Sequence, residues 1–414
     1  MLTAFTIQNY KSILDLRVDF SFDGRAPAGW QKAERLPFLQ IGPKVTDRLV
    51  PVLALYGSNA SGKSTIVEAF LSFLFLLQQG VGNLFRPNKL NRKYAATAFT
   101  VEVSLGGKRY VYSIVYANRR IQRESLTRGD GSILYKIEDE RVDFSGIESG
   151  MYDGPRLEEM ARVECMRDNV FVRPALLRVV RNFPGLNSEV SEVAKDLQLD
   201  IFYLSTSNNS PLLGKVDERE GKVTFGQDVT LEEVAQILRQ FDFGIKSLHL
   251  DSLEPSSDAQ GNKQSVFYEP ALRSVHEDTE GNEVTFNFLQ EESGGTLRIV
   301  RLLVPLLRAL KHGGLVIIDE LDESIHPLVL VTLVRLFTSR RHNLKNARLF
   351  FTVHDTILLE EGTLRATEVG VVSKTLRSGT RLTRLCDFEG QPSVGEFRKD
   401  YLCGRFGGIP FPHI

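Results

Sequence analysis

The sequence is poor in cysteine, methionine and tryptophan, and it carries almost no net charge. Its 414 residues include 3 cysteines, 4 methionines and 1 tryptophan, and the formal net charge is −1. The cysteines lie far apart, at Cys165, Cys386 and Cys403, so they provide neither a disulfide framework nor a zinc site, which fits a reducing cytoplasm. A net charge near zero excludes a protein that is a nucleic-acid polycation over its whole surface.

Long hydrophobic runs are also absent. A membrane-spanning helix needs about 18 or more consecutive apolar residues. The densest apolar run, residues 70–77, is shorter than this, and the start of the chain at Met1 has no basic stretch typical of a secretion signal. With 42% hydrophobic residues the chain can still bury a large core. We therefore expect a cytoplasmic protein without a membrane partner.

The sequence does contain a complete phosphate-binding loop. The loop consists of Gly57, Ser58, Asn59, Ala60, Ser61, Gly62, Lys63, Ser64 and Thr65. It follows the apolar run at residues 52–56 and precedes a helical pattern, which is the context that the motif requires. The glycines let backbone N–H groups point at phosphate oxygens, Lys63 reaches the β- and γ-phosphates, and Ser64 offers its hydroxyl to Mg²⁺. The loop predicts binding of a nucleoside triphosphate with Mg²⁺, and by itself it leaves open a kinase, a GTPase, a motor or a transporter subunit. The choice of ATP as the cofactor depends on the resemblance described below.

Two adjacent carboxylates end a second apolar run. Residues 315–318 are typical of a buried parallel strand, and Asp319 and Glu320 follow it directly. A carboxylate in this position can hold Mg²⁺, and its neighbour can polarise the water that attacks the γ-phosphate. We predict Asp319 as a magnesium ligand and Glu320 as the catalytic base, the alternative being a solvated acidic turn.

A glycine-containing turn precedes the helical pattern of residues 297–310. Ser293, Gly294 and Gly295 form a helix N-terminus that can face an anion. Because the P-loop already surrounds one side of a triphosphate, a second such helix start suggests a composite site closed by another subunit. The alternative is an ordinary helix start with Ser293 as its N-cap. We expect a kink at Pro305.

A histidine follows a third apolar strand pattern. His354 comes after residues 347–353 and can contact the γ-phosphate or the attacking water, although such a histidine is more often structural.

The order of these motifs resembles that of ATP-binding-cassette ATPases of the SMC and OLD type. In that comparison, residues 57–65, 293–295, 319–320, 321–327 and 351–355 look like the Walker A motif, the signature, the Walker B motif, the D-loop and the H-switch. The start of the chain is also similar, and it implies that Lys11 and Ser12 lie near the nucleotide, with Lys11 where arginine is usual. The signature reads Glu-Ser-Gly-Gly-Thr instead of Leu-Ser-Gly-Gly-Gln.

Both ends of the chain narrow the resemblance. Residues 354–359 and the ending at residues 401–410 look like the stand-alone prokaryotic ATPases of anti-phage defence loci, a branch that includes RloA and the AriA subunit of PARIS systems. Only sixty residues follow His354, so we expect no nuclease domain in this chain. The resemblance therefore implies a separate effector protein, a nuclease encoded nearby, which the ATPase controls.

The predicted fold is α/β, an ABC-type P-loop domain with a β-rich lobe. Residues 1–154 would form the N-terminal half of the ATPase, with strands at 2–20, 98–105 and 108–116 and a loop excursion at 24–45. Residues 155–215 would form a short helical insert in place of a coiled coil. Residues 216–414 would form the C-terminal half, with a helix at 231–241 and a polar loop at 256–263. A strand at 284–288 would join the antiparallel strands of the N-terminal half in the β-rich lobe.

The predicted function is ATP hydrolysis by a homodimer or higher homo-oligomer that regulates a separate effector. One alternative is a DNA-repair or recombination ATPase of the RecF or SMC type. Another is a scaffold that ATP stabilises and in which turnover is incidental. The net charge does not show DNA binding, although the combined surface of an oligomer could provide it.

Overall fold

The computed structural model describes residues 1–22, 38–43, 47–90, 95–139, 141–144, 146–147, 154–176, 188–199, 201–204, 213–217, 222–225, 229–241, 243–250, 266–268, 272–360, 362–375, 377–388 and 396–409. All structural statements below concern these residues.

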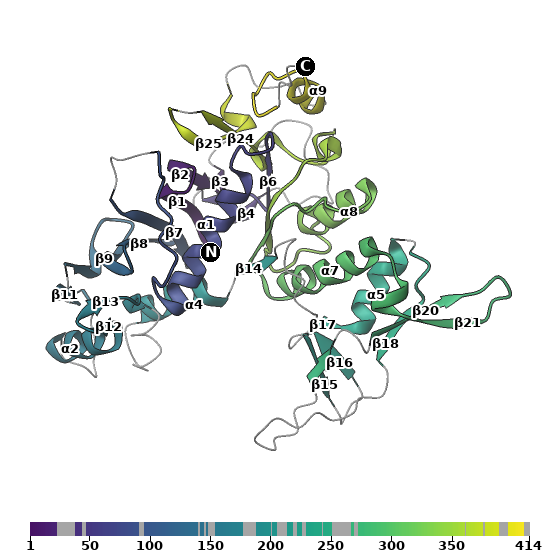
Figure 1. Cartoon of the computed structure of the whole chain (residues 1–414), viewed down its shortest axis with the longest axis horizontal. Coiled ribbons are helices and arrows are strands. Elements are labelled where there is room, and N and C mark those ends of the chain that lie inside the picture. The colour runs from purple at the N-terminus through teal and green to yellow at the C-terminus, as the bar shows by residue number, and fades with distance from the viewer. Residues whose placement is uncertain are drawn as a thin grey trace.

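A six-stranded, mostly parallel sheet lies at the centre of the molecule (Figure 1). Its strands, in spatial order, are β14 (Ile201–Leu204), β22 (Leu315–Ile318), β23 (Arg348–Thr352), β6 (Val52–Tyr56), β24 (Val369–Thr375) and β25 (Gly379–Arg384). The first five run parallel to their neighbours, and β25 pairs antiparallel with β24. The carboxyl ends of β6, β22 and β23 therefore meet at one edge of the sheet.

Strand β6 contributes to two hydrophobic cores. Successive side chains of a strand point to opposite faces of its sheet. Leu53 and Leu55 pack in a core with helix α1 (Lys63–Gln79), whereas Val52, Ala54 and Tyr56 pack in a second core with helices from the C-terminal half of the chain. Burial on both faces explains the continuous apolar run that the sequence shows.

The first core is shared with a seven-stranded antiparallel sheet. Its strands, in spatial order, are β11 (Arg141–Asp143), β10 (Ile133–Glu138), β9 (Arg120–Arg128), β8 (Lys108–Ala117), β7 (Thr97–Leu105), β1 (Leu2–Tyr10) and β2 (Ile13–Asp19). Aromatic side chains join the sheet to α1: the Phe5 ring lies 4.2 Å from that of Phe70 and 5.5 Å from that of Phe73, centroid to centroid. The strands confirm the alternating patterns of the N-terminal sequence. The strand predicted at 284–288 is not part of this lobe: it is found as β21 (Glu283–Asn287), which pairs with β20 (Leu272–Glu277) in a separate sheet, because alternation does not reveal which strand is the partner.

Helices of the C-terminal half cover the second core. They are α5 (Leu231–Gln240), α7 (Gly294–His312), α8 (Pro327–Thr338) and α9 (Phe397–Leu402), with the one-turn α6 (Phe288–Glu291) before α7. Pro305 lies inside α7, which continues as one helix to His312. Helix α5 begins with a capping box between Thr230 and Glu233. The remaining helices are α2 (Gly154–Cys165) and α4 (Ser188–Leu199) and the 3₁₀ turns η2 (Thr356–Leu359), η3 (Ala366–Glu368) and η4 (Leu385–Asp387).

Smaller sheets complete the described structure. They are β3 (Ser21–Phe22), β5 (Arg48–Leu49) and β4 (Leu39–Gln40); β12 (Met166–Arg167) and β13 (Val170–Phe171); β17 (Val229–Thr230), β16 (Lys222–Phe225), β15 (Leu213–Asp217) and β19 (Val266–Tyr268); and β18 (Ser247–Leu250), β20 (Leu272–Glu277) and β21 (Glu283–Asn287). The β20–β21 hairpin projects from the edge of the molecule (Figure 1).

The range predicted as a helical insert, residues 155–215, is only partly helical. It contains α4 and most of α2, but also β14, which pairs with β22 at the edge of the central sheet. A strand of the central sheet thus lies before residue 216. Periodicity did not reveal this strand, because it is short and its pairing partner is distant in the sequence. The predicted polar loop at 256–263 and most of the excursion at 24–45 lie outside the described residues.

No described helix is both long enough and apolar enough to cross a membrane.

Candidate nucleotide-binding site

The P-loop connects β6 to α1 through backbone conformations that residues with side chains rarely adopt. Gly62 has φ +108°, and Ala60, which is not a glycine, has φ +62°. A Cβ added at Gly57 would collide with the carbonyl oxygen of Val372, and one at Gly62 would collide with the side chain of Thr380. Both glycines are therefore required by close packing against the β24–β25 hairpin, which fixes the shape of the loop.

Lys63 is held inside this loop. Its side chain is buried, at 5% exposure, and its Nζ donates to the carbonyl oxygens of Gly57 at 2.7 Å and Ser58 at 3.2 Å. Burial lowers the pKa of Lys63, and the nearby carboxylates of Asp319 and Glu320 oppose that shift. The sheet therefore brings the predicted Walker A lysine and Walker B carboxylates into one electrostatic site, although more than half of the chain separates them.

Thr352, at the end of β23, links the two carboxylate residues. Its hydroxyl donates to Oδ1 of Asp319 at 2.6 Å and accepts the backbone N–H of Glu320 at 2.7 Å. Glu320 has φ +51°, a left-handed conformation that a non-glycine residue adopts only when its surroundings impose it. Sequence reasoning gave Thr352 no role. The available signal was a hydroxyl at the end of the strand that precedes the predicted switch histidine.

Asp322 connects the D-loop to the segment around His354. Its Oδ2 accepts the backbone N–H groups of His354 at 2.8 Å and Asp355 at 2.7 Å. The ring of His354 is exposed, so the backbone is fixed while the imidazole faces outward. Tyr56 donates its hydroxyl to the carbonyl oxygen of Asp355 at 3.0 Å, which ties the same segment to the end of β6.

The predicted signature turn begins α7. Ser293 caps the helix, because its Oγ accepts the N–H of Thr296 at 3.1 Å. A Cβ on Gly295 would come within 2.9 Å of the carbonyl oxygen of Ser324 in the D-loop. Ser293 and Gly294 are exposed, and no hydrogen bond joins residues 293–295 to residues 57–65, all of which are described. Within one chain, the turn and the P-loop are separate.

Arg298 of α7 connects this helix to the turn that contains Glu320 and Glu323. Its Nη2 donates to the carbonyl oxygen of Glu320 at 2.6 Å, and its Nη1 lies 3.1 Å from Oε2 of Glu323. Burial lowers the pKa of Arg298, while Glu323 opposes this. The sequence analysis did not identify this residue, which lies one helical turn after the signature and therefore on the face that meets the D-loop.

Glu292, the unusual first residue of the signature, is held by two side chains of β20. Its Oε1 lies 2.6 Å from Nε2 of His276 and accepts a short hydrogen bond from Oγ of Ser274. Leucine at this position could not accept these bonds. The substitution thus connects the turn to the projecting β20–β21 hairpin.

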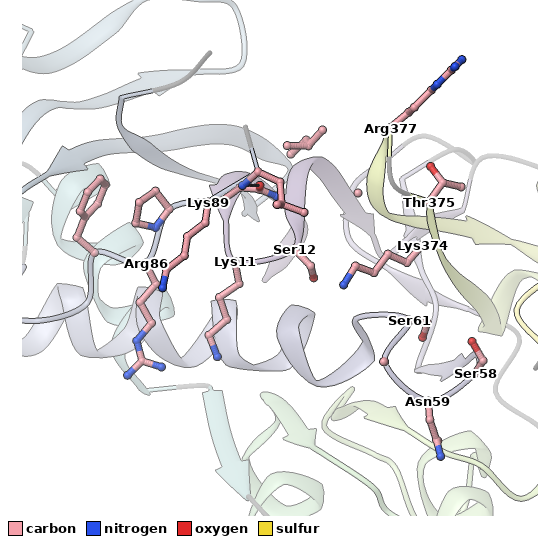
Figure 2. Close-up of a pocket in the computed structure, with 17 residues that line it drawn as sticks. Lys11, Ser12, Ser58, Asn59, Ser61, Arg86, Lys89, Lys374, Thr375 and Arg377 are labelled. Carbon is pink, nitrogen blue, oxygen red and sulfur yellow. Dashed lines mark hydrogen bonds between the residues drawn. The ribbon is translucent and has the colours of Figure 1, made fainter. Parts of the chain in front are cut away.

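A basic pocket of about 910 Å³ adjoins the P-loop. Its cationic side chains are Lys11, Arg86, Lys89, Lys374 and Arg377, and none of the described residues that line it is acidic. Figure 2 shows Lys374 extending from the β24 side across the pocket in the direction of Ser12, with Arg377 pointing out of the pocket.

Outside the P-loop, the predicted nucleotide-binding residues Lys11 and Ser12 line this pocket. Lys11 forms an ion pair with Glu68 of α1, and Ser12 Oγ lies 2.8 Å from Oγ1 of Thr380, which also donates to the carbonyl oxygen of Ser61 at 3.1 Å. Two hydrogen bonds, through Thr380, therefore connect Ser12 to the P-loop backbone. Arg86 and Lys89, on the loop after α1, were not predicted.

The residues present fit a magnesium ion held together with a nucleotide. Ser64 is exposed at the start of α1. Asp319 accepts the hydrogen bond from Thr352 on Oδ1, and its second carboxylate oxygen, Oδ2, would be the metal ligand. Within the part of the chain that the structure describes, there is no cluster of three or more histidine, cysteine or acidic residues that could hold a metal by itself. One hydroxyl and one carboxylate, completed by phosphate oxygens and water, form a typical Mg²⁺ environment.

A family model described as "AAA domain, putative AbiEii toxin, Type IV TA system" matches residues 191–360. This range contains the predicted signature, Asp319, Glu320 and His354, but it is less than half of the chain and does not include the P-loop. The search of curated proteins found no match. Together with the P-loop and the parallel sheet, the family match supports a P-loop ATPase.

Solved structures give distant likenesses over most of the chain. The SMC head domain from Thermotoga maritima is 11% identical, covering 92% of this chain and 98% of its own, with a TM-score of 0.40. The Smc head domain from Pyrococcus furiosus, solved with the C-terminal domain of ScpA, is 10% identical, with 98% and 99% coverage and a TM-score of 0.40. The recombination mediator RecF with a bound nucleotide is 10% identical, with 93% and 98% coverage and a TM-score of 0.37. At this level of similarity, function has to be argued from the chain's own residues.

Proposed function

We propose that this protein binds and hydrolyses ATP with Mg²⁺ at the junction of the P-loop and strands β22 and β23. The observation that carries the proposal is the convergence of Lys63, Asp319 and Glu320 at one edge of the central sheet, where both carboxylates act electrostatically on the buried lysine. When a triphosphate binds, the ammonium group of Lys63 can replace its hydrogen bonds to the loop carbonyl oxygens with charge-assisted hydrogen bonds to phosphate oxygens.

Each residue has a distinct role in the proposed reaction. Lys63 and the N–H groups of residues 59–65 bind the β- and γ-phosphates, and Ser64 and Asp319 would hold the magnesium ion. When bound there, the ion would supply positive charge to offset the charge that develops on the phosphoryl oxygens. Glu320 orients the attacking water and takes its proton, while Thr352 fixes the turn that carries it. His354, whose ring is exposed at the same sheet edge, contacts the γ-phosphate.

The active form in this proposal contains at least two copies of the chain. Ser293 and Gly294 are exposed and separate from their own P-loop, so they can reach a nucleotide only on another copy. A helix N-terminus whose N–H groups face a γ-phosphate stabilises the negative charge there. Closure of two copies would therefore complete two composite sites, each with a P-loop from one copy and a signature turn from the other.

The biological role that we propose is control of a separate effector protein, a nuclease, in anti-phage defence. This role is supported by the match to a family whose description names a toxin and by the resemblance of residues 354–359 and 401–410 to defence ATPases. Since the fold does not determine the output of an ATPase, the role depends on these similarities and not on the site.

A DNA-repair or recombination ATPase of the RecF or SMC type is a second candidate. The basic pocket beside the P-loop has five cationic side chains, and no acidic residue lines it among the described residues. This pocket favours the second candidate, because DNA phosphates could bind to part of its surface. A scaffold that ATP stabilises would use the same binding residues without needing Glu320 as a base.

ATP turnover measured against protein concentration tests the proposal. In the composite site, turnover per subunit rises with concentration, and Glu320→Gln abolishes it while leaving nucleotide binding intact. Tight ATP binding without turnover in the wild type would establish the scaffold instead. Turnover that DNA stimulates several-fold would favour the repair ATPase.

A further inference from the structure

The C-terminal segment that follows α9 lies against the first glycine of the P-loop. In the described residues it runs from Cys403 to Ile409, directly after α9, which carries Tyr401 and lies beside β24 and β25 at the top of Figure 1. The sequence analysis identified this ending only by its resemblance to other chains, and nothing in the proposed reaction uses it.

Three contacts define this junction, which we name the C-terminal clamp (Tyr401 and Gly408). The Tyr401 ring packs edge-on against the Tyr56 ring, with 5.5 Å between centroids. Its hydroxyl donates to the carbonyl oxygen of Gly408 at 3.4 Å. Burial raises the pKa of Tyr401, and the backbone N–H of Gly57, which faces the phenol oxygen, opposes that shift.

Gly408 packs so closely against its neighbours that a side chain at this position would collide with them. It has φ +71°, and a Cβ placed on it would lie 2.6 Å from Cγ1 of Val371, 3.4 Å from the carbonyl oxygen of Val372 and 3.6 Å from Cα of Gly57. The same Val372 carbonyl is the one that excludes a side chain at Gly57. The start of the P-loop is therefore enclosed between β24 and the clamp.

We propose that Tyr401 and Gly408 are positioning residues for nucleotide binding, because they hold Gly57 at the point where β6 turns into the P-loop. Lys63 donates to the Gly57 carbonyl, so a displacement of Gly57 also moves the lysine and the N–H groups that follow. Residues more than 300 positions apart thus form one phosphate site. This inference rests on the proposed binding of ATP.

The chain offers a matched pair of substitutions. Gly407 has φ +66°, close to that of Gly408, but a Cβ added there meets nothing within 4 Å. Gly407→Ala and Gly408→Ala therefore introduce similar left-handed strain, and only the second pushes on β24 and the P-loop. The difference between the two variants isolates the contact from the backbone conformation.

The experiment measures the affinity for ATP with Mg²⁺ by calorimetry in the wild type, Gly407→Ala and Gly408→Ala, alongside the melting temperature without nucleotide. We expect ATP to bind about ten-fold more weakly to Gly408→Ala than to Gly407→Ala, since overpacking displaces neighbouring backbone. A lower melting temperature with unchanged affinity would mean a merely structural contact and would overturn the inference.

Tyr401→Phe keeps the proposal testable if Gly408→Ala does not fold. It retains the ring contact with Tyr56 and removes only the hydroxyl, so ATP should bind several-fold more weakly while the fold is kept. Equal affinity in Tyr401→Phe and wild type would contradict a positioning role. If the wild type itself binds no ATP, or if Lys63→Ala binds it equally well, the proposed function fails and not this inference alone.

Discussion

The P-loop and the signature turn are both helix N-termini built to face an anion, but they differ in how complete they are. Ser61 and Lys63 are buried, at 3% and 5% exposure, and the loop packs against Val372 and Thr380. Ser293 and Gly294 are exposed, and the hydrogen bonds of Ser293 stay within its own helix. The P-loop half of the proposed site, which we call the finished half, is complete within a single chain. The signature half, which we call the outward-facing half, is exposed, as the proposed completion by a second copy requires.

The largest effect should come from the catalytic base of the finished half. Glu320→Gln keeps the size of the side chain and removes its ability to take a proton, so turnover should fall by about 10²- to 10⁴-fold. ATP affinity should stay within about two-fold, because the glutamate carboxylate does not contact the phosphates in the proposed arrangement. Turnover is measured by phosphate release and affinity by calorimetry. Wild-type turnover in the variant would show that Glu320 is not the base.

Lys63→Ala should break the finished half at the binding step. It removes charge-assisted hydrogen bonds to the phosphates, and the loss should weaken ATP binding by about 100-fold or more. Far-UV circular dichroism should show an unchanged fold, since Lys63 bonds only to the carbonyl oxygens of its own loop. An affinity within a few-fold of wild type would exclude the P-loop as the phosphate site.

Ser293→Arg tests the outward-facing half. A bulky cation at this exposed position should block closure and lower turnover at least about ten-fold, while leaving ATP binding to the P-loop intact. Mixing it with Lys63→Ala should restore part of the turnover, because a mixed dimer contains one intact P-loop opposite one intact signature turn. If the mixture is as inactive as its components, the two halves do not work in trans.

Thr352→Val should have a smaller effect within the finished half. It preserves the shape of the side chain but removes the hydroxyl that holds Asp319 and the N–H of Glu320. We expect turnover to fall about ten-fold, since a buried N–H loses its acceptor and the carboxylates lose their orientation. Thr352→Ser, which keeps the hydroxyl, is the matched control and should retain most of the activity. Equal loss in both variants would point to packing.

The smallest expected effect concerns the basic pocket. Lys374 and Arg377 are both exposed cations that line the pocket, but only Lys374 extends across it, whereas Arg377 points outward (Figure 2). Lys374→Ala should weaken ATP binding by about five-fold or less, as exposed charges contribute little in water. Arg377→Ala should leave the affinity unchanged at the same ionic strength. An equal effect of both would indicate a diffuse electrostatic surface.

Local patterns were enough to predict the elements on either side of each motif. The apolar run before Gly57, the run before Asp319 and the alternating N-terminal strands are all found where the sequence indicated, because hydrophobic periodicity directly reflects which faces are buried. The edge strand β14 was missed, since four residues within a helical context carry too little pattern to reveal a parallel partner.

The predicted roles of Lys63, Ser64, Asp319, Glu320, Ser293 and His354 remain predictions that the experiments above address. The residues that support them could not be found from sequence. Thr352, Arg298, His276 and Tyr401 act through hydrogen bonds, ion pairs or ring contacts with residues elsewhere in the chain, and such contacts leave no periodic signal.

Local sequence was sufficient to predict a loop for phosphate, two carboxylates after a buried strand and a helix start that can face an anion. These predictions depend on residue types at short, fixed spacings, which local backbone geometry is sufficient to interpret. Which of these groups lie at the same edge of the sheet could be seen in the folded chain alone. The parallel order of β22, β23 and β6 brings the P-loop to the sheet edge that carries Asp319 and Glu320, and Ser293 is left exposed, because long-range strand pairing depends on the whole chain.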